Sequence, residues 1–180
     1  MSDIHKVETN NLIVPLQVYQ TSARLIEEVL SDVDYLGEDS TIETVLELLQ
    51  HCLFLSMGKV MIAREGQLHL LGGYETPAFK QEITYGFDEG LIGRAFKTGR
   101  VVTAFDLVHD ENYKGKFTPV NELPYRMPGF TAVPIKDESG SCLGVLAVNH
   151  GGRSDIERAE AVAVLCKTAK LLVPLLRHNL

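Results

Sequence analysis

Apolar residues recur at spacings of three and four in three parts of the chain, and this spacing predicts helices. The predicted helices cover about residues 16–33, 40–55 and 154–176. Residues 40–43 have the form of a capping box, so we expect the second helix to open there. Pro174 is expected to disturb the last turn of the third helix.

Between the second and third helices the pattern changes to short runs rich in strand-forming residues. One short amphipathic helix interrupts them, from about Leu91 to Lys97, and we expect it to end at Gly99. The other predicted elements are a hairpin turning at 65–66, strands at 82–87 and 100–107, and a hairpin turning at 137–140.

Antiparallel hairpins combined with terminal helices predict the α+β class, with the helices packed on one face of the sheet. A length of 180 residues and a hydrophobic content of 45% suit one globular domain. The polar stretch 107–128 contains three prolines, and a loop of this length inside a domain favours a functional role.

Charge and cysteine content exclude several classes of protein. A formal charge of -7 leaves no basic surplus for direct binding of nucleic acid. No signal peptide or membrane-spanning run is visible, so we expect no membrane partner and a cytoplasmic location. Cys52, Cys142 and Cys166 lack the spacing of a disulfide frame or a zinc site, so only Cys142, beside a predicted turn, merits a test of reactivity.

Four glycines between residues 86 and 99 raise the question of a phosphate-binding loop. Their spacing fits neither the P-loop nor the dinucleotide-binding fingerprint. We interpret them as a strand exit, a turn, a close helix contact and a helix stop. The N-terminus of the short helix still offers free N–H groups to an anion.

The run GLIGRAFKTGRVV at 90–102, Asp106 after the next strand, and the hairpin VPIKDESGSCLGVL at 133–146 resemble the GAF domain family. The segment YRMPGFTAVPIKDESGSCLGVLAV at 125–148 is most similar to the N-terminal GAF domains of nitrogen-fixation (NifA-type) sigma-54-dependent activators. Because the resemblance covers about 38–178, we expect an N-terminal segment and helix at 1–37 and a single GAF sensor domain at 38–180.

The resemblance implies a twisted antiparallel sheet of about six strands, with the terminal helices on one face. The other face is expected to hold a small-molecule pocket beneath the short helix and the long loop. A sensor of this kind controls an output module outside the chain, here a transcription activator. The NifA-type resemblance implies 2-oxoglutarate as the ligand, or a regulatory protein partner.

A dicarboxylate requires cations and hydrogen-bond donors in its pocket. Arg126, between two prolines at the exit of the long loop, is the first candidate. Arg94 and Lys116 also fit the role of ordinary surface charges. His109 is a lone histidine in a loop, and such a residue is more often solvated than bound to haem. The candidate ligand-binding residues are Arg94, His109, Tyr113, Lys116 and Arg126.

We expect no catalytic residue and no cofactor, and therefore no enzyme, because no nucleophile with a base and no metal cluster emerges from the sequence. One alternative is a thiol-redox enzyme of the free methionine sulfoxide reductase type that uses Cys142. Another is a ligand-free module for dimerisation or partner docking, which a pocket filled entirely by its own apolar side chains would favour. Cyclic nucleotides stay open as ligands, although only Phe87-Asp88-Glu89 remains of the N-K-F-D-E signature.

The terminal helices also predict the assembly. Each carries an apolar stripe, and the closing helix has more apolar positions than packing on one sheet requires. Such a surface is typical of a subunit interface, so we expect a homodimer through the terminal helices.

Overall fold

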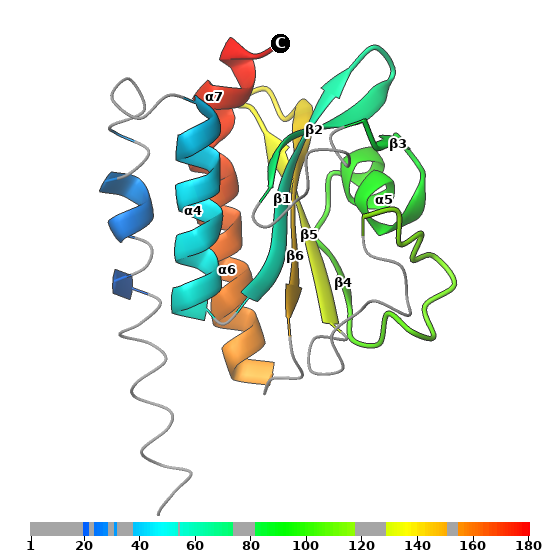
Figure 1. Ribbon diagram of the computed structural model, residues 1–180, viewed down its shortest axis with the longest axis horizontal. Coiled ribbons are helices and arrows are strands. Elements are labelled where there is room, and N and C mark those ends of the chain that lie inside the picture. The colour runs from blue at the N-terminus through cyan, green and yellow to red at the C-terminus, as the bar shows by residue number, and fades with distance from the viewer. Residues whose placement is uncertain are drawn as a thin grey trace, which may run out of the picture.

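The computed structural model describes residues 20–21, 24–28, 31, 38–53, 55–73, 82–117, 129–150 and 155–180. These residues form an α+β fold around a six-stranded antiparallel sheet with the strand order β3-β2-β1-β6-β5-β4 (Figure 1). The strands are β1 (Leu55–Arg64), β2 (Gln67–Gly73), β3 (Thr84–Gly86), β4 (Val102–Ala104), β5 (Gly129–Lys136) and β6 (Cys142–His150), and the helices are α4 (Glu38–Leu53), α5 (Gly90–Thr98), α6 (Asp155–Leu171) and α7 (Val173–His178).

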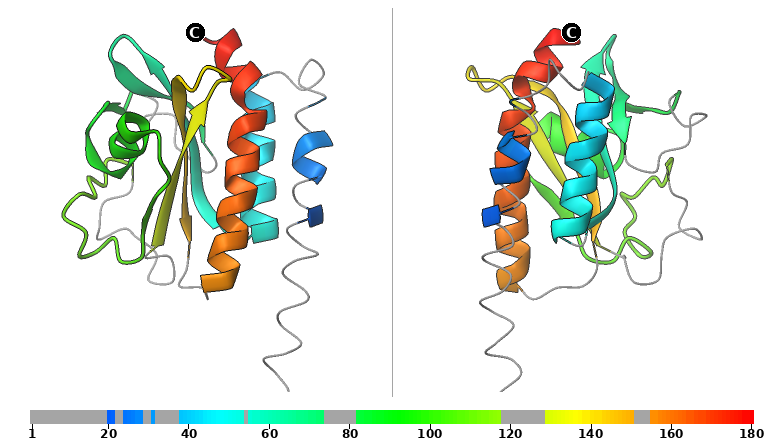
Figure 2. Two further views of the ribbon diagram at one scale, coloured as in Figure 1. Left: turned by 180° about the vertical axis from the view of Figure 1, so that it is seen from behind. Right: turned by 60° about the vertical axis from the view of Figure 1, so that its left-hand side comes forward.

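Helices α4 and α6 cover one face of the sheet (Figure 2). Their apolar stripes pack on alternate residues of the strands, such as Val60 and Ile62 of β1, and together bury the larger of two cores. Ile26, from the N-terminal part of the chain, is fully buried in this core. An ion pair between Glu27 and Lys167 (3.0 Å) ties the same part of the chain to the outer surface of α6.

Helix α5 covers the opposite face and buries a second core. Met61 of β1 belongs to it, because successive residues of a strand point to opposite faces. Leu91, Ile92 and Ala95 supply the buried side of α5, and Phe130 projects from β5. This face carries the candidate site.

The predicted end of the short helix and the predicted break in the closing helix are both confirmed. Gly99 has φ 60° and caps α5 in the left-handed conformation. Helix α6 ends before Leu172, and Pro174 lies in the first turn of α7. The predicted start of the second helix was wrong, because α4 begins at Glu38 and residue 40 lies inside it. Most of the predicted helix at 16–33 lies outside the described residues.

The glycine run is confirmed as a packing device. A Cβ atom on Gly93 would lie 2.5 Å from the carbonyl oxygen of Gly86 and 2.9 Å from the carbonyl carbon of Asp88. Only glycine therefore allows α5 to lie this close to the turn that precedes it.

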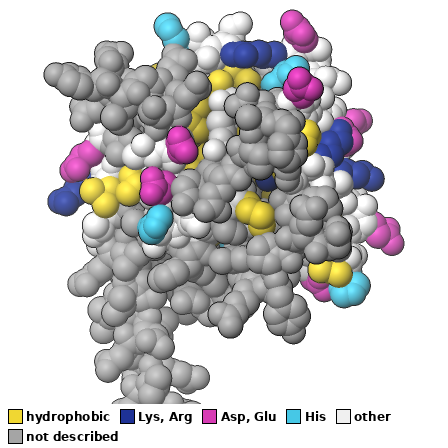
Figure 3. All heavy atoms as spheres, in the orientation of Figure 1, with side chains coloured by type: hydrophobic (Ala, Val, Ile, Leu, Met, Phe, Trp, Pro, Cys, Tyr) yellow, Lys and Arg dark blue, Asp and Glu magenta, His cyan; other side chains and the backbone are white. Residues whose placement is uncertain are grey.

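Charged side chains of both signs lie side by side on the surface on which α5 lies, at the right of the face seen in Figure 3. Two of the ion pairs of this region are Lys97–Asp88 (3.3 Å) and Lys116–Glu89 (2.6 Å). Among the described residues, no helix is long and apolar enough to span a bilayer.

Candidate functional site

A small pocket lies between the sheet and α5. Its cavity volume of about 10 Å³ is close to the room that one water molecule needs. Four aromatic rings, two aliphatic side chains and two lysines form its wall. These are Lys59, Tyr85, Leu91, Ile92, Tyr113, Lys114, Phe117 and Phe130.

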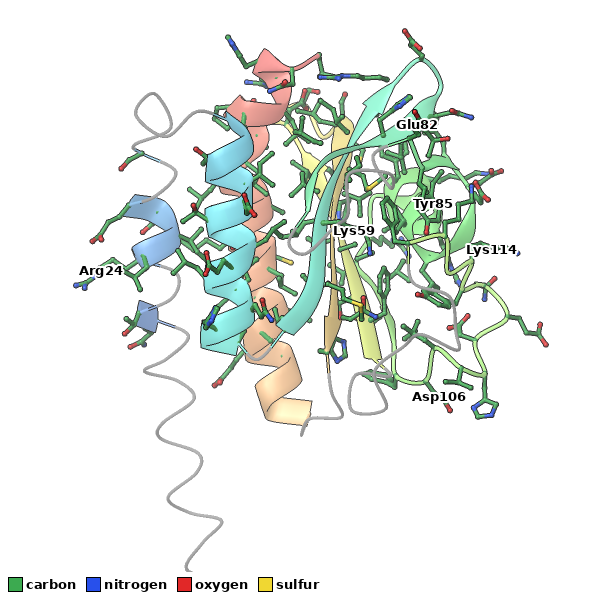
Figure 4. The ribbon with its side chains drawn as sticks, viewed as in Figure 1. Arg24, Lys59, Glu82, Tyr85, Asp106 and Lys114 are labelled. Atoms are coloured by element: carbon green, nitrogen blue, oxygen red, sulfur yellow. The ribbon has the colours of Figure 1, made fainter. Side chains whose placement is uncertain are left out.

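Lys59 supplies a cation at the base of this pocket. It projects from β1, which lies in the interior of the sheet between β2 and β6, and it is only 6% exposed. Its ammonium group lies 4.8 Å from the centre of the Phe117 ring, a cation–π contact. Figure 4 shows Lys59 on the strand, Tyr85 beside α5, and Lys114 farther out on the segment that follows β4. A buried ammonium attracts anions strongly, because little water screens its charge.

A bulge in β1 sets the direction of Lys59. The pairing of β1 with β6 shifts between Ser56 and Lys59, and Met57 adopts the left-handed conformation at φ 49°. A Cβ atom on Gly58 would lie 2.9 Å from Leu46 Cδ2, so the bulge presses the backbone against α4. Bulges and non-glycine residues at positive φ are strained features that cluster near functional sites.

Asn149 adds a buried polar group on the same face. Lys59 pairs with Ala147 of β6, and Asn149 lies two residues farther along that strand, so both side chains point to the α5 side. Asn149 is 1% exposed, and within the described part of the chain its amide nitrogen Nδ2 has no hydrogen-bond partner. A buried donor without an acceptor is costly, and a bound acceptor would remove that cost.

The two tyrosines of the pocket remain protonated, neutral donors at physiological pH. Burial raises the pKa of Tyr113 to about 12. Burial also raises the pKa of Tyr85, whose ring stacks on Phe117 with 6.0 Å between the ring centres. The pocket wall therefore presents ammonium and phenol donors among aromatic rings, while the Asn149 amide lies on the same face of the sheet but does not line the pocket.

An ion pair fastens the segment after β4 to the turn before α5. Lys116 Nζ donates to Glu89 Oε2 (2.6 Å) and to the carbonyl oxygen of Thr84 (2.8 Å). The same Glu89 oxygen accepts from the backbone N–H of Gly86 (2.9 Å). The hydrogen bond from Lys116 is the main reason that the pKa of Glu89 lies below its ordinary value. We call this set of contacts the Glu89–Lys116 clamp.

The predicted site residues do not converge on one point. Tyr113 lines the pocket, whereas Lys116 is engaged in the clamp. His109 is exposed and bonds Asp106 (2.7 Å), and Arg94 lies on the exposed side of α5, beside a different hollow. Arg126 lies outside the described residues.

Among the described residues that line the pocket, Tyr113 is the one that the sequence analysis named as a ligand-binding candidate, and both charged residues, Lys59 and Lys114, were missed. Lys59 had a visible signal, since it is a single lysine within a strand whose neighbours at 60–62 are all apolar. Its inward direction depends on the bulge, for which Gly58 inside the strand is a local signal that the sequence analysis did not use. The sequence alone does not distinguish Lys114 from Lys116. In the structure Lys116 belongs to the clamp, whereas Lys114 lines the pocket.

The described cysteines show no sign of activation. Burial raises the pKa of Cys142, and its thiol donates to the carbonyl oxygen of Gly144 (3.4 Å). Burial likewise raises the pKa of Cys166. A raised pKa leaves little thiolate, the nucleophilic form. Within the described residues, no group of three His, Cys, Asp or Glu side chains is placed to hold a metal ion.

A family model described as the GAF domain matches residues 36–173. No curated protein sequence matches the chain.

Several crystal structures share the fold. The GAF domain of nlh2 from A. aeolicus, in an inactive state, has a TM-score of 0.79 and 18% identity, over 92% of this chain and 99% of that chain. A putative GAF sensor protein from Burkholderia vietnamiensis has a TM-score of 0.67 and 16% identity, over 86% and 92%. The free methionine-R-sulfoxide reductase of Neisseria meningitidis, in complex with its substrate, has a TM-score of 0.68 and 17% identity, over 90% and 92%. At these identities the likeness establishes the fold.

Proposed function

The chain belongs to the GAF domain family, and we propose that it is a sensor domain that binds a small dianionic metabolite in the pocket between α5 and the sheet. The buried ammonium of Lys59 is the observation that carries the proposal. Its positive charge lies in the pocket wall, in cation–π contact with Phe117, and such a charge attracts an anion. A ligand carboxylate in place of the Phe117 ring would form a charge-assisted contact with this ammonium group.

A dianion suits this pocket better than a monoanion. The pocket has a second lysine, Lys114, whose side chain is exposed at the rim, so the two ammonium groups lie at different depths. The protonated phenols of Tyr85 and Tyr113 would donate to the remaining ligand oxygens. A short dicarboxylate offers one acceptor group to each lysine.

2-Oxoglutarate is the dicarboxylate that we propose. The support is the resemblance of residues 125–148 to NifA-type activators, which also makes a transcription activator the proposed output module. In that scheme binding moves Phe117 and the clamped segment, and a change in this segment reaches the output module or a regulatory protein partner.

The test is calorimetric titration of the chain with 2-oxoglutarate, other dicarboxylates and cyclic nucleotides. We expect a dicarboxylate to bind and Lys59→Met to weaken binding at least about tenfold, the loss of roughly one charge-assisted hydrogen bond. Lys114→Met should also weaken binding, and because Lys114 is exposed this variant keeps the test valid if Lys59→Met misfolds.

Lys97→Met is the matched control, since Lys97 lies on α5 in an ion pair with Asp88 and does not line the pocket. The proposal fails if only a cyclic nucleotide binds, or if both pocket variants bind as tightly as the wild type. Arg126→Ala is a separate arm of the titration. An unchanged affinity there would remove Arg126 from the site.

The filled state of the pocket favours a second candidate function, a ligand-free docking module. A volume of about 10 Å³ has no room for a metabolite unless side chains move. A crystal structure grown with saturating 2-oxoglutarate distinguishes the two functions. In a docking module the aromatic rings stay in place, whereas in a sensor Phe117 is displaced.

A thiol-redox enzyme is the remaining alternative. The raised pKa of Cys142 argues against it, because a thiol needs thiolate character to attack a sulfoxide. Turnover of free methionine sulfoxide that disappears in Cys142→Ser would overturn the sensor proposal.

A further inference from the structure

Exposed apolar side chains are concentrated around β4, one of the two edge strands of the sheet. Four large hydrophobic residues are exposed in the described part of the chain, and three of them are Val101 (38%), Phe105 (56%) and Val108 (52%). The fourth, Leu180, is the last residue of the chain. Exposed apolar residues that gather in one place, unlike scattered ones, are typical of an interaction surface.

Two arginines flank the same edge. Arg94 and Arg100 are exposed and line a hollow of about 330 Å³ together with Thr98, Val101 and Val102. Neither guanidinium forms an ion pair with a described carboxylate, although the chain carries 24 acidic residues. The neighbouring Lys97, by contrast, is paired with Asp88.

A second hollow lies on the other side of Val101. It measures about 400 Å³, and its wall contains two lysines, Lys136 and Lys170, and also two carboxylates, Asp137 and Glu138, which pair with Arg177. Seen from behind, β4 lies between α5 and α6 (Figure 2), and the two hollows are lined by residues of these two helices. The edge therefore presents exposed apolar side chains beside a hollow on the α5 side whose charged wall residues are both arginines.

We propose that the edge of the sheet at β4, with Arg94, Arg100, Val101, Phe105 and Val108, is the docking surface for an extended acidic segment of a partner protein. Apolar side chains of that segment would cover the exposed apolar side chains of the edge, and its carboxylates would pair with the arginines. With only three residues in β4, backbone pairing adds little, so side-chain contacts determine the affinity. This surface shares no lining residue with the pocket around Lys59 and does not depend on the metabolite.

The test is fluorescence anisotropy of the chain with a labelled synthetic peptide composed of Glu, Val and Ser, without metabolite. The net charge of -7 repels an acidic peptide, so binding requires a local basic surface. We expect binding that weakens with salt and falls at least about tenfold in the Arg94→Gln/Arg100→Gln double variant, as for the loss of charge-assisted contacts. Phe105→Ser should weaken binding as well.

Matched controls are Lys97→Gln for the charges and Leu180→Ser for the apolar residues, and both should bind as the wild type does. A peptide with Lys in place of Glu should not bind. The proposal is overturned if no peptide binds, if the Lys peptide binds equally well, or if the double variant keeps its affinity. Dimerisation that the double variant abolishes, without peptide binding, would instead identify a second copy of the chain as the occupant and also overturn it.

Discussion

Gly93 is a residue at which the backbone leaves no room for a side chain. The nearest atoms to an added Cβ belong to the backbone of Gly86 and Asp88, which cannot move as a flexible side chain can. We predict that Gly93→Ala lowers the free energy of unfolding by about 1–3 kcal/mol, the usual cost of overpacking. Urea unfolding of the wild type and of Gly93→Ala measures this difference in the free energy of unfolding. Lys97→Ala, an exposed change on the same helix, should stay within about 0.5 kcal/mol; equal effects of the two changes would refute the packing argument.

Single residues also mark the limit of what the sequence predicts. The role of Gly99 could be predicted, because a glycine after a short amphipathic helix has a common local meaning. The role of Lys59 could not, since its burial depends on Phe117, which is far away in the sequence, and on a bulge in its own strand. Sequence patterns report local preference, whereas a pocket is made by residues distant along the chain.

At the scale of elements, the Glu89–Lys116 clamp joins the turn before α5 to the segment after β4. The pKa of Glu89 lies below its ordinary 4.5, so the folded chain favours the carboxylate. Its contribution to stability is therefore complete above pH 4.5 and is lost as the pH falls below that value. Glu89→Gln should destabilise the chain at pH 7 by about 1 kcal/mol or less, as for partly exposed pairs.

Urea unfolding of wild type and Glu89→Gln across the acid range tests this prediction. The difference between the two proteins should disappear as the pH falls toward the lowered pKa of Glu89 and beyond. Glu111→Gln, an exposed change on the same segment, should show no such pH dependence. A difference that persists in acid would mean that the clamp does not act through the charge of Glu89.

The order of the elements was predictable, and their ends were less so. Hairpin turns at 65–66 and 137–140 are strong local signals, and both hairpins are present as β1–β2 and β5–β6. The capping box at 40–43 was misleading, because α4 begins at Glu38 and residue 40 lies inside it.

At the scale of the whole molecule, the homodimer stays a prediction. Helix α6 has an outer surface on which Ala159 and Ala163 are exposed and Val162 and Cys166 are half-buried. Small apolar residues of this kind allow two helices to approach closely. We predict that Val162→Glu converts a dimer into a monomer in light scattering, whereas Lys97→Glu on the opposite side of the sheet leaves the dimer intact. A monomeric wild type would refute the dimer.

If the chain is the proposed sensor, the Phe117 ring affects the concentration range over which it responds. Because the ring covers Lys59 in the structure, an entering metabolite competes with a part of the chain itself, and the apparent dissociation constant exceeds the intrinsic one. Phe117→Ala should therefore tighten binding in calorimetry and lower the threshold of the response, although it removes apolar contacts. The affinity of Phe117→Leu should lie between those of the wild type and Phe117→Ala. Weaker binding in Phe117→Ala would mean that the ring holds the ligand and does not exclude it. If Phe117 excludes the ligand as proposed, substitution at this one position adjusts the affinity of the pocket while both lysines stay unchanged.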